Sequence, residues 1–525
     1  MKALQALLLL LLALLGARAL PFGDGKPAMG FNTWNAFRTN INEKQIMEIA
    51  DLMVSLGLRD AGYTYLNLDD AWSERERVGG KLVANKERFP SGIQALADYV
   101  HSKGLKFGIY GDAGAMTCAR YPGSLGYEEV DAQTFAEWGV DYLKYDNCFA
   151  KREDWVLDRY RAMGQALNAT GRPILYSLCN WGVMEPWLWA PQIGHSWRVT
   201  EDILPTWDNV VKLLDYSVGL SRFGGKGTGF ADMDMLYVGN NHLGEYRPYG
   251  PFYQEQKMHF ALWALMKSPL MVGHDLRSIN DSSLELLLKK EIIAINQDEL
   301  GVPGDLIWQQ GTRRVFAGPL AGGARAVVMA NFQTTQTQYP MSNVTVYWEQ
   351  LGLRRDQAAT VRDVYGERDL GVFRGSFSAA IATHDVAVLR ITPVEGPLDD
   401  SWRPWHGQPL YAAQPANLAV PRPQDWIPNY SGPSSASPAQ SEGKQQPAST
   451  QRQVPSTSHG PPGFALVLSC VVAVAALGIV GYYIVLQRRL RGWQALEDSE
   501  AARKAGELAR LQQRSKDGWG NGSHP

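Results

Sequence analysis

The 525-residue sequence contains few cysteines and no excess of charge of either sign. Four cysteines are too few for a disulfide-framework protein or a cysteine-rich zinc array. The 51 basic residues are balanced by 53 acidic ones, whereas a nucleic-acid binder needs a basic face. Because 45% of the residues are hydrophobic and 10% aromatic, the chain can bury a large core, which excludes disorder over most of its length. The composition predicts a globular protein of more than one domain, with no nucleic-acid partner.

Nucleotide-binding and metal-binding motifs are also absent. There is neither a GxGxxG nor a GxxxxGK[ST] fingerprint, which argues against a doubly wound nucleotide-binding sheet. There is no HExxH motif and no histidine cluster, so we expect no metal and no cofactor. One metal hypothesis stays open, in which Asp232 and Asp234 form the DxD site of a glycosyltransferase.

Each end of the chain carries a long apolar stretch. Residues 1–19 have an early lysine, a Leu/Ala run and a small-x-small end, which is typical of a secretory signal peptide. Residues 464–486 contain no charge and are long enough to span a bilayer as a tilted helix. Arginines follow directly, which places the tail 487–525 in the cytoplasm. We expect a single-pass type I membrane protein whose folded part is luminal or extracellular.

The segment between the folded part and the expected membrane helix indicates a tether. Residues 394–463 form a linker and a stalk that is rich in Ser, Thr and Pro, and residues 431–462 contain no aromatic residue that could form a core. Asn-x-Ser/Thr sequons fit glycosylation of a luminal chain. These candidates are Asn168, Asn280, Asn343 and Asn429.

Residues 20–301 alternate between short apolar runs and amphipathic helical patterns. Eight such βα units in about 280 residues are the count and size of a TIM barrel, the (β/α)8 fold of the α/β class. The polar residues gather at the carboxyl end of each run, where active sites of that fold lie. The expected strands are within 27–34, 63–70, 105–112, 140–147, 173–181, 195–203, 227–236 and 269–276.

The pattern changes after residue 301. Six segments alternate apolar and polar residues at period two, and no helical pattern separates them. Residues 302–393 therefore predict an antiparallel β-sandwich. The six segments are 306–310, 313–320, 325–332, 344–351, 359–365 and 385–393.

The expected strand ends of the barrel carry an unusual number of carboxylates. A glycoside hydrolase needs two carboxyl groups beside the scissile bond, and further carboxylates and cations can hold sugar hydroxyls. Lys144 and Asp146 are two residues apart on one strand, so their side chains point to the same face, where the cation would keep the carboxylate ionised. A purely structural ion pair fits that spacing equally well. The carboxylates are Asp69, Asp70, Asp112, Asp146, Asp202, Asp232 and Asp234.

At these residues the sequence resembles glycoside hydrolase family 27, the α-galactosidases and α-N-acetylgalactosaminidases. The matching motifs run in order through the whole expected barrel. They are MGFNTWN (29–35), FRTNINE (37–43), YLNLDDAW (65–72), LKFGIYGDAG (105–114), the segment 117–148 that ends in YLKYDNC, YSLCNWG (176–182), SWRVTEDI (196–203), DMDML (232–236) and KSPLMVGHD (267–275).

The resemblance implies a retaining, exo-acting α-galactosidase that needs no cofactor. It makes Asp146 the nucleophile and Asp202 the acid/base, and we expect Lys144 to keep Asp146 ionised while Asp202 holds its proton. It also implies a disulfide between Cys118 and Cys148. The implied substrate-binding residues are Trp34, Asp69, Asp70, Tyr110, Lys144, Cys179, Trp181, Arg198 and Asp234.

Cys179 and Trp181 would lie beside the 2-position of the sugar, where their bulk favours galactose over N-acetylgalactosamine. The chain departs from the family pattern in three places. At FGCNINE and DDCW, Thr39 and Ala71 replace the two cysteines of a second disulfide. The family motif WNDPDML reads FADMDML here, and the expected membrane anchor is not typical of the family. The alternatives are an α-N-acetylgalactosaminidase, a β-L-arabinopyranosidase, and a sugar-binding surface receptor without turnover. The sequence does not indicate the aglycone or the oligomeric state.

Overall fold

The computed structural model describes residues 25–150, 156–239, 253–333 and 341–394. The expected signal peptide (1–19), the stalk beyond residue 394, the expected membrane segment (464–486) and Asn429 lie outside these residues. Within the described part of the chain, no helix combines the length and the apolar character needed to cross a membrane.

Eight parallel strands form one sheet in the order β7-β6-β5-β4-β3-β2-β1-β8. A parallel bridge between Leu236, just after β7, and Val272 in β8 joins the two edges of this sheet. Each strand lies inside one of the eight runs expected from the sequence, so the TIM-like arrangement is confirmed. The strands are β1 (Met29–Asn32), β2 (Tyr65–Asn67), β3 (Lys106–Asp112), β4 (Tyr142–Asp146), β5 (Leu175–Leu178), β6 (Ser196–Arg198), β7 (Phe230–Asp232) and β8 (Leu270–Val272).

A glycine in β3 makes room for larger side chains from the neighbouring strands inside the barrel. A Cβ on Gly108 would lie 1.9 Å from the Asn67 Oδ1 and 3.0 Å from the Tyr142 Cβ, so only glycine fits in β3 at this height. Tyr65 and Tyr142 pack edge to face with ring centroids 5.5 Å apart. The lower barrel is therefore filled by aromatic rings, which leaves the polar side chains at the carboxyl ends of the strands.

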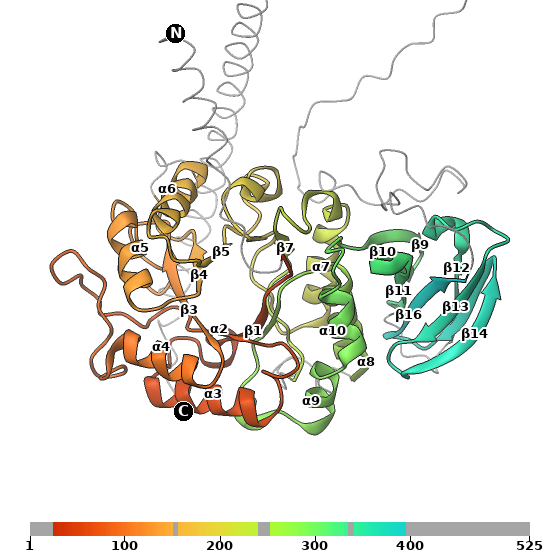
Figure 1. Ribbon diagram of the computed structural model, residues 1–525, viewed down its shortest axis with the longest axis horizontal. Coiled ribbons are helices and arrows are strands. Elements are labelled where there is room, and N and C mark those ends of the chain that lie inside the picture. The colour runs from red at the N-terminus through yellow and green to blue at the C-terminus, as the bar shows by residue number, and fades with distance from the viewer. Residues whose placement is uncertain (1–24, 151–155, 240–252, 334–340, 395–525) are drawn as a thin grey trace, which may run out of the picture. The chain divides into compact units, whose positions relative to one another are not determined.

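Amphipathic helices cover the outside of the strands (Figure 1). In α3, buried Ile46, Ile49 and Met53 recur at helical spacing, and the Asn42 side chain caps the first turn by accepting from the Gln45 N–H at 3.0 Å. The helices are α2 (Thr33–Phe37), α3 (Glu43–Ser55), α4 (Gly92–Ser102), α5 (Glu128–Glu137), α6 (Val156–Ala169), α7 (Trp207–Ser217), α8 (Tyr253–Leu265), α9 (Asp281–Leu287) and α10 (Lys290–Asn296).

The residues after the barrel form two antiparallel sheets. Six strands pair in the order β14-β13-β16-β11-β10-β9, and β12 pairs with β15. Valines of β12 share a buried apolar cluster with β10, β11 and β16, so the small sheet packs on the large one. The strands are β9 (Asp305–Gln310), β10 (Arg313–Pro319), β11 (Arg325–Asn331), β12 (Ser342–Tyr347), β13 (Ala358–Asp363), β14 (Arg368–Arg374), β15 (Ser376–Ile381) and β16 (Asp385–Pro393).

Two of these strands were not expected from the sequence. β14 has no buried residue and β15 has one, Ile381, so neither shows the alternation that marked the other six segments. The turn between them is made by Gly375, whose φ of +76° lies in the region that glycine favours. The expected antiparallel fold of this domain is therefore confirmed, and β14 and β15 add two strands to the segments that the sequence pattern marked.

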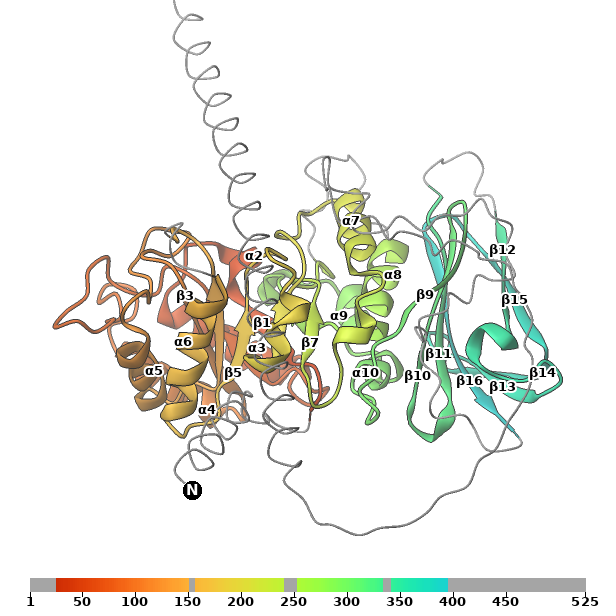
Figure 2. The same cartoon turned by 90° about the horizontal axis from the view of Figure 1, so that it is seen from above.

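Helix α8 lies between the barrel strands and β10, β11 and β16 in both views (Figures 1 and 2). The helix is buried on nearly all sides, because one face meets the barrel and the opposite face meets the sheet. Glu255 of α8 pairs with the His384 Nδ1 at 2.8 Å, and Lys257 pairs with Asp385 at 2.8 Å. The two domains thus share one continuous core and several buried polar contacts.

Candidate functional site

The predicted site residues converge at the carboxyl ends of the barrel strands. Asp69 and Asp70 follow β2, Tyr110 lies in β3, Lys144 and Asp146 lie in β4, and Cys179 follows β5. Arg198 ends β6, Asp202 follows it by four residues, and Asp234 follows β7 by two. In a parallel barrel these ends share one face, which the sequence pattern had predicted.

Lys144 pairs with Asp69 and not with Asp146. Its Nζ lies 2.8 Å from the Asp69 Oδ2, and the Asn32 Nδ2 donates to the same oxygen at 2.8 Å. Burial by itself would lower the pKa of Lys144, but the nearby carboxylates, Asp69 foremost, raise it above its ordinary value. The expected Lys144–Asp146 pair is therefore wrong as a direct contact, because the lysine reaches across to β2.

Asp70 is held by backbone groups of two loops. Its Oδ1 accepts from the Ala71 N–H at 2.6 Å and its Oδ2 from the Ala119 N–H at 2.8 Å. Burial raises its pKa, which these hydrogen bonds oppose. Ala71 has a φ of +76°, so the chain accepts a strained backbone here to orient the pair Asp69–Asp70.

Asp146 is buried and accepts two hydrogen bonds. The Tyr110 hydroxyl donates to its Oδ2 at 3.0 Å and the Asn147 N–H to its Oδ1 at 3.0 Å. Burial raises the pKa of Asp146 to about 6, since the lowering by Lys144 is smaller and the charges of Asp202 and Asp69 add to the rise. The expectation that the lysine would dominate is wrong for this carboxyl group.

Asp202 lies at the mouth of the site, with its side chain 58% exposed. The Arg198 Nη2 is 3.1 Å from the Asp202 Oδ1 and 3.0 Å from the Asp234 Oδ2. Burial alone would raise the pKa of Asp202, but Arg198 and then Lys144 outweigh it and hold the pKa below the usual range. We expected Asp202 to keep its proton more readily than Asp146, and the order in the free protein is the reverse.

Asp112 had no role in the sequence interpretation beyond its place at a strand end. It pairs directly with Asp146 in the β3–β4 register, and its carboxylate accepts from the Gly114 N–H at 2.7 Å and the Cys148 N–H at 3.0 Å. Burial and then the charge of Asp146 raise its pKa to about 9. Asp112 ties the loop after β4 to the loop after β3, and the expected Cys118–Cys148 disulfide joins the same two loops.

The site offers no good position for a metal ion among the described residues. Asp112, Cys118, Asp146 and Cys148 bring their donor atoms within 4.8 Å of one another, but the two sulfurs are bonded to each other and cannot act as thiolates. The proposed DxD pair does not fit a metal either. The Asp232 Oδ1 accepts from the Asp234 N–H at 2.8 Å, and the Asp234 carboxylate is neutralised by Arg198.

Cys179 and Trp181 lie where β5 ends. The Cys179 Sγ is buried, is not in a disulfide, and lies 3.7 Å from the Arg198 Nη1. Trp181 is partly buried and has a φ of +55°. The next residue, Gly182, packs so tightly that a Cβ would lie 2.3 Å from the Val199 carbonyl oxygen. This loop therefore packs closely against the residue that follows β6.

Trp34 is partly buried at the start of α2, beyond the end of β1. The Asn32 Oδ1 accepts a hydrogen bond from the backbone N–H of Trp34 at 2.8 Å, and the Trp34 ring packs on the apolar side chains inside the barrel. The guanidinium of Arg38 lies 5.3 Å from the centroid of this ring. Asn32 and Arg38 are thus two polar neighbours of the site that sequence reasoning missed, although Asn32 lies inside the matched motif MGFNTWN.

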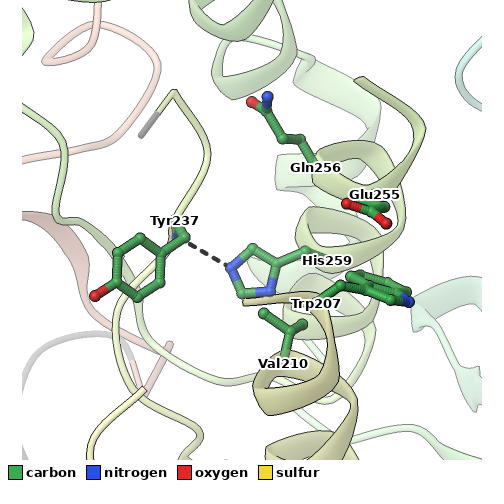
Figure 3. A pocket seen from close by; sticks show the side chains of 6 residues that line it. All are labelled: Trp207, Val210, Tyr237, Glu255, Gln256 and His259. Atoms are coloured by element: carbon green, nitrogen blue, oxygen red, sulfur yellow. Dashed lines mark hydrogen bonds between the residues drawn. The ribbon is translucent and has the colours of Figure 1, made fainter. Parts of the chain in front are cut away.

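A small cavity lies elsewhere, between α7, α8 and the segment after β7 (Figure 3). His259 accepts there from the Tyr237 N–H at 3.2 Å, and burial lowers its pKa to about 3, so it stays neutral. None of the predicted site residues lines this cavity, so we assign no catalytic role to it. Its lining consists of Trp207, Val210, Tyr237, Glu255, Gln256 and His259.

Comparisons with known proteins agree with this geometry. The family profile described as alpha galactosidase A matches residues 26–298, and the alpha galactosidase C-terminal beta sandwich domain matches residues 310–391. Alpha-galactosidase 3 of Arabidopsis thaliana is 47% identical over 372 residues, which cover 70% of this chain and 82% of the relative.

Two further comparisons extend the likeness to other organisms. A probable alpha-galactosidase of Dictyostelium discoideum is 42% identical over 398 residues, 75% of this chain and 100% of the relative. The crystal structure of alpha-galactosidase I from Mortierella vinacea superposes with a TM-score of 0.64 at 36% identity, covering 70% of this chain and 96% of that one.

Proposed function

The chain belongs to the α-galactosidases of glycoside hydrolase family 27, and we propose that it releases terminal α-linked galactose with retention of configuration, Asp146 acting as nucleophile and Asp202 as acid/base. The observation that carries the assignment is the placement of these two carboxyl groups. Asp146 is buried at the end of β4, whereas Asp202 lies at the mouth of the site beside Arg198, where a leaving group would depart. The charge of Asp202 contributes to the raised pKa of Asp146, as expected for two carboxyl groups that line one site.

The two steps of the reaction follow from that placement. Asp146 attacks the anomeric carbon while Asp202 gives its proton to the glycosidic oxygen, and the aglycone leaves. Asp202 then takes a proton from water, which attacks the galactosyl–Asp146 ester from the opposite side. Two inversions restore the α configuration. Tyr110 stabilises the Asp146 carboxylate as it leaves in the second step, through the 3.0 Å hydrogen bond.

The remaining site residues bind the sugar in this proposal. Asp69 and Asp70 accept from galactose hydroxyls, and Lys144 and Arg198 donate to others. Trp34 supplies an apolar surface, and Asp234 orients Arg198 through their 3.0 Å contact. Retention of both catalytic carboxyl groups in one site supports an enzyme over a sugar-binding receptor, because a receptor has no need of a paired acid and nucleophile.

The loop after β5 supports galactose over N-acetylgalactosamine. In this proposal Cys179 and Trp181 occupy the space that an N-acetyl group would need, and the support is the close packing of the next residue, Gly182, against the Val199 carbonyl oxygen. We expect wild-type enzyme to prefer p-nitrophenyl α-galactoside over its N-acetyl analogue by at least about 100-fold in kcat/KM, the discrimination that steric exclusion gives.

The matched variant is Cys179→Ala with Trp181→Ala. It should lower that preference at least about tenfold and weaken galactose turnover, because both contacts to the 2-position are removed. Arg355→Gln, on the far sandwich domain, is the control. A wild type that prefers the N-acetylated substrate would show that the enzyme is instead an α-N-acetylgalactosaminidase.

We also propose that the catalytic domain is luminal or extracellular and anchored by residues 464–486. The support is the signal-like stretch 1–19, the uncharged segment 464–486 and the arginines behind it. The disulfide between Cys118 and Cys148 fits an oxidising compartment. Of the glycosylation candidates, Asn280 and Asn343 are exposed and Asn168 is partly exposed near the end of α6.

Protease protection tests this topology. Trypsin added outside intact cells or sealed vesicles should cut in the stalk and release an active fragment of the catalytic domain, while an epitope on the tail 487–525 stays protected. The same digestion after detergent treatment is the control. Release of the tail epitope with a protected catalytic domain would mean the opposite orientation.

A further inference from the structure

Four arginines lie together beside the site, on loops that follow consecutive barrel strands. The Arg88 Nη1 donates to the Thr39 carbonyl oxygen at 3.2 Å, which joins the loop after β1 to the loop after β2. The ring of Tyr121 lies under two of the guanidinium groups, with 4.7 Å and 5.7 Å between group and centroid. We name this cluster the arginine patch. It consists of Arg38, Arg75, Arg88 and Arg120.

None of the four has a carboxylate partner among the residues that the structure describes. In the same region Arg77 pairs with Asp131 at 2.6 Å, so ion pairs form where an acid is in reach. Glu74, next to Arg75 in the chain, accepts instead from the Lys86 N–H at 2.9 Å. Among the described residues, the only carboxylate whose pKa Arg38 lowers is Asp202, and no ion pair offsets the charge of the patch.

Aromatic rings hold the guanidinium groups in fixed planes. Arg38 lies over Trp34 at 5.3 Å, Arg120 over Phe149 at 5.1 Å, and the other two over Tyr121. A guanidinium that stacks on a ring through its face can still present N–H groups at its edge, and such edges match the two oxygens of a carboxylate or sulfate. In Arg88 the Nη1 already donates to the Thr39 carbonyl oxygen and the Nη2 to the Tyr121 hydroxyl at 3.3 Å, so this arginine offers only its remaining N–H groups.

Two of the arginines occupy a backbone conformation that favours glycine. Arg38 has a φ of +52° and Arg120 a φ of +65°, and the related family pattern FGCN has glycine at the first of these positions. An arginine there is strained, and such strain persists mainly where a side chain is needed in one place. The two side chains are thus aimed by the loops that carry them.

The patch is continuous with the catalytic mouth. Arg38 lies over the ring of Trp34 and is near enough to Asp202 to contribute to the lowering of its pKa. The residue before Arg120 is Ala119, whose N–H holds Asp70. A substrate whose galactose contacts Asp69 and Asp70 must direct its remaining sugars out through this mouth, past Asp202.

We propose that the arginine patch binds a carboxylate or sulfate group on the sugars beyond the terminal galactose, so that the enzyme prefers α-galactosides with an acidic aglycone. The inference rests on the proposed α-galactosidase function and adds the class of its substrate. A soluble acidic glycan is favoured over an anionic membrane surface, because the patch borders the site where the leaving sugar emerges.

The test compares two α-galactosyl trisaccharides that differ only at the reducing end, which is glucose in one and glucuronic acid in the other. At low salt, wild-type kcat/KM should be at least about fivefold higher for the acidic substrate, mainly through KM, and about 0.5 M NaCl should abolish the preference. Arg75→Gln with Arg88→Gln should bring the ratio close to one. Arg355→Gln, whose side chain is 89% exposed on the sandwich domain, is the control and should leave the ratio unchanged.

Other outcomes overturn the proposal. A wild-type ratio near one at low salt, or the same loss of ratio in Arg355→Gln, would exclude acidic-aglycone recognition by the patch. The patch would be assigned to a membrane surface instead if the wild type shows a ratio near one and co-sediments with phosphatidylserine vesicles, while the double variant does not co-sediment. If the wild type cleaves neither trisaccharide, the proposed function fails. The role of the patch is then still tested by calorimetry, which compares the affinity of the wild type for the acidic and the neutral trisaccharide.

Discussion

Replacing Asp146 by glycine should abolish hydrolysis of every α-galactoside, with a loss on the order of 10⁴-fold or more in kcat. No other group in the site can take its place. Asp112 is buried and holds two backbone N–H groups, Asp69 is bound to Lys144, and Asp202 is the proposed acid at the mouth of the site. We expect the space left by the missing carboxylate to admit a small anion.

Azide should restore part of the activity of Asp146→Gly and should form β-galactosyl azide. The azide attacks the anomeric carbon from the side of the lost carboxylate, and Asp202 gives its proton to the departing oxygen, so one inversion remains. Product analysis by NMR, with wild type and the conservative Asp146→Asn as controls, checks this. α-Galactosyl azide from Asp146→Gly would mean that a different residue is the nucleophile.

Replacing Asp202 by alanine should give a defect that depends on the leaving group. Loss of a general acid costs about 10²- to 10⁴-fold where the leaving oxygen needs a proton, and much less for a dinitrophenyl galactoside. The galactosyl–Asp146 ester then accumulates, since no base activates water. Azide should release it as α-galactosyl azide, the opposite anomer from the one expected for Asp146→Gly.

The pH dependence follows from the order of the two pKa values. Asp146 has a pKa of about 6 and Asp202 one below its usual range, so the last proton of the pair is lost near pH 6. Above that pH no proton is left for the leaving group, and wild-type kcat/KM for an oligosaccharide should fall about tenfold per pH unit. Below the lower pKa both groups are protonated and the nucleophile is lost. The optimum therefore lies between the two values, in the acid range.

Asp202→Ala changes the shape of this profile. With a dinitrophenyl substrate its kcat/KM should rise as Asp146 ionises and then stay level, because no acid remains to be deprotonated. The rise should come at lower pH than about 6, since the neighbouring negative charge that raises the pKa of Asp146 is gone. A falling alkaline limb in the variant, at the pH of the wild-type limb, would assign that limb to another residue.

The barrel could be predicted because its signals are local in the sequence. Each buried strand is a short apolar run, each covering helix repeats its apolar residues at helical spacing, and polar residues mark where a strand ends. The strands β14 and β15 could not be found in this way, because both are mostly exposed. β14 is ordered by hydrogen bonds to β13, the strand just before it, and β15 by hydrogen bonds to β12, from which β13 and β14 separate it in the chain.

The membership of the site was determined by the sequence, and its electrostatics were not. That Asp69, Asp146 and Asp202 share one face follows from parallel strands whose ends point the same way. Which carboxylate Lys144 would reach could not follow, because the spacing on β4 offered Asp146 and the competing partner comes from β2. Asp112 was missed as a support of the nucleophile loop for the same reason, since its partners lie in two loops.

The tertiary structure alone decided the order of the pKa values of Asp146 and Asp202 and the assembly of the arginine patch. A pKa depends on how much water a group loses and on charges across the barrel, such as that of Arg198 beside Asp202. The four arginines of the patch are spread over residues 38–120 and meet only because three loops close over Tyr121. The residue types and their periodicity can be read from the sequence, and they were sufficient to predict the fold and the family. The burial of a group and its distance from other charges are defined only once the chain has folded.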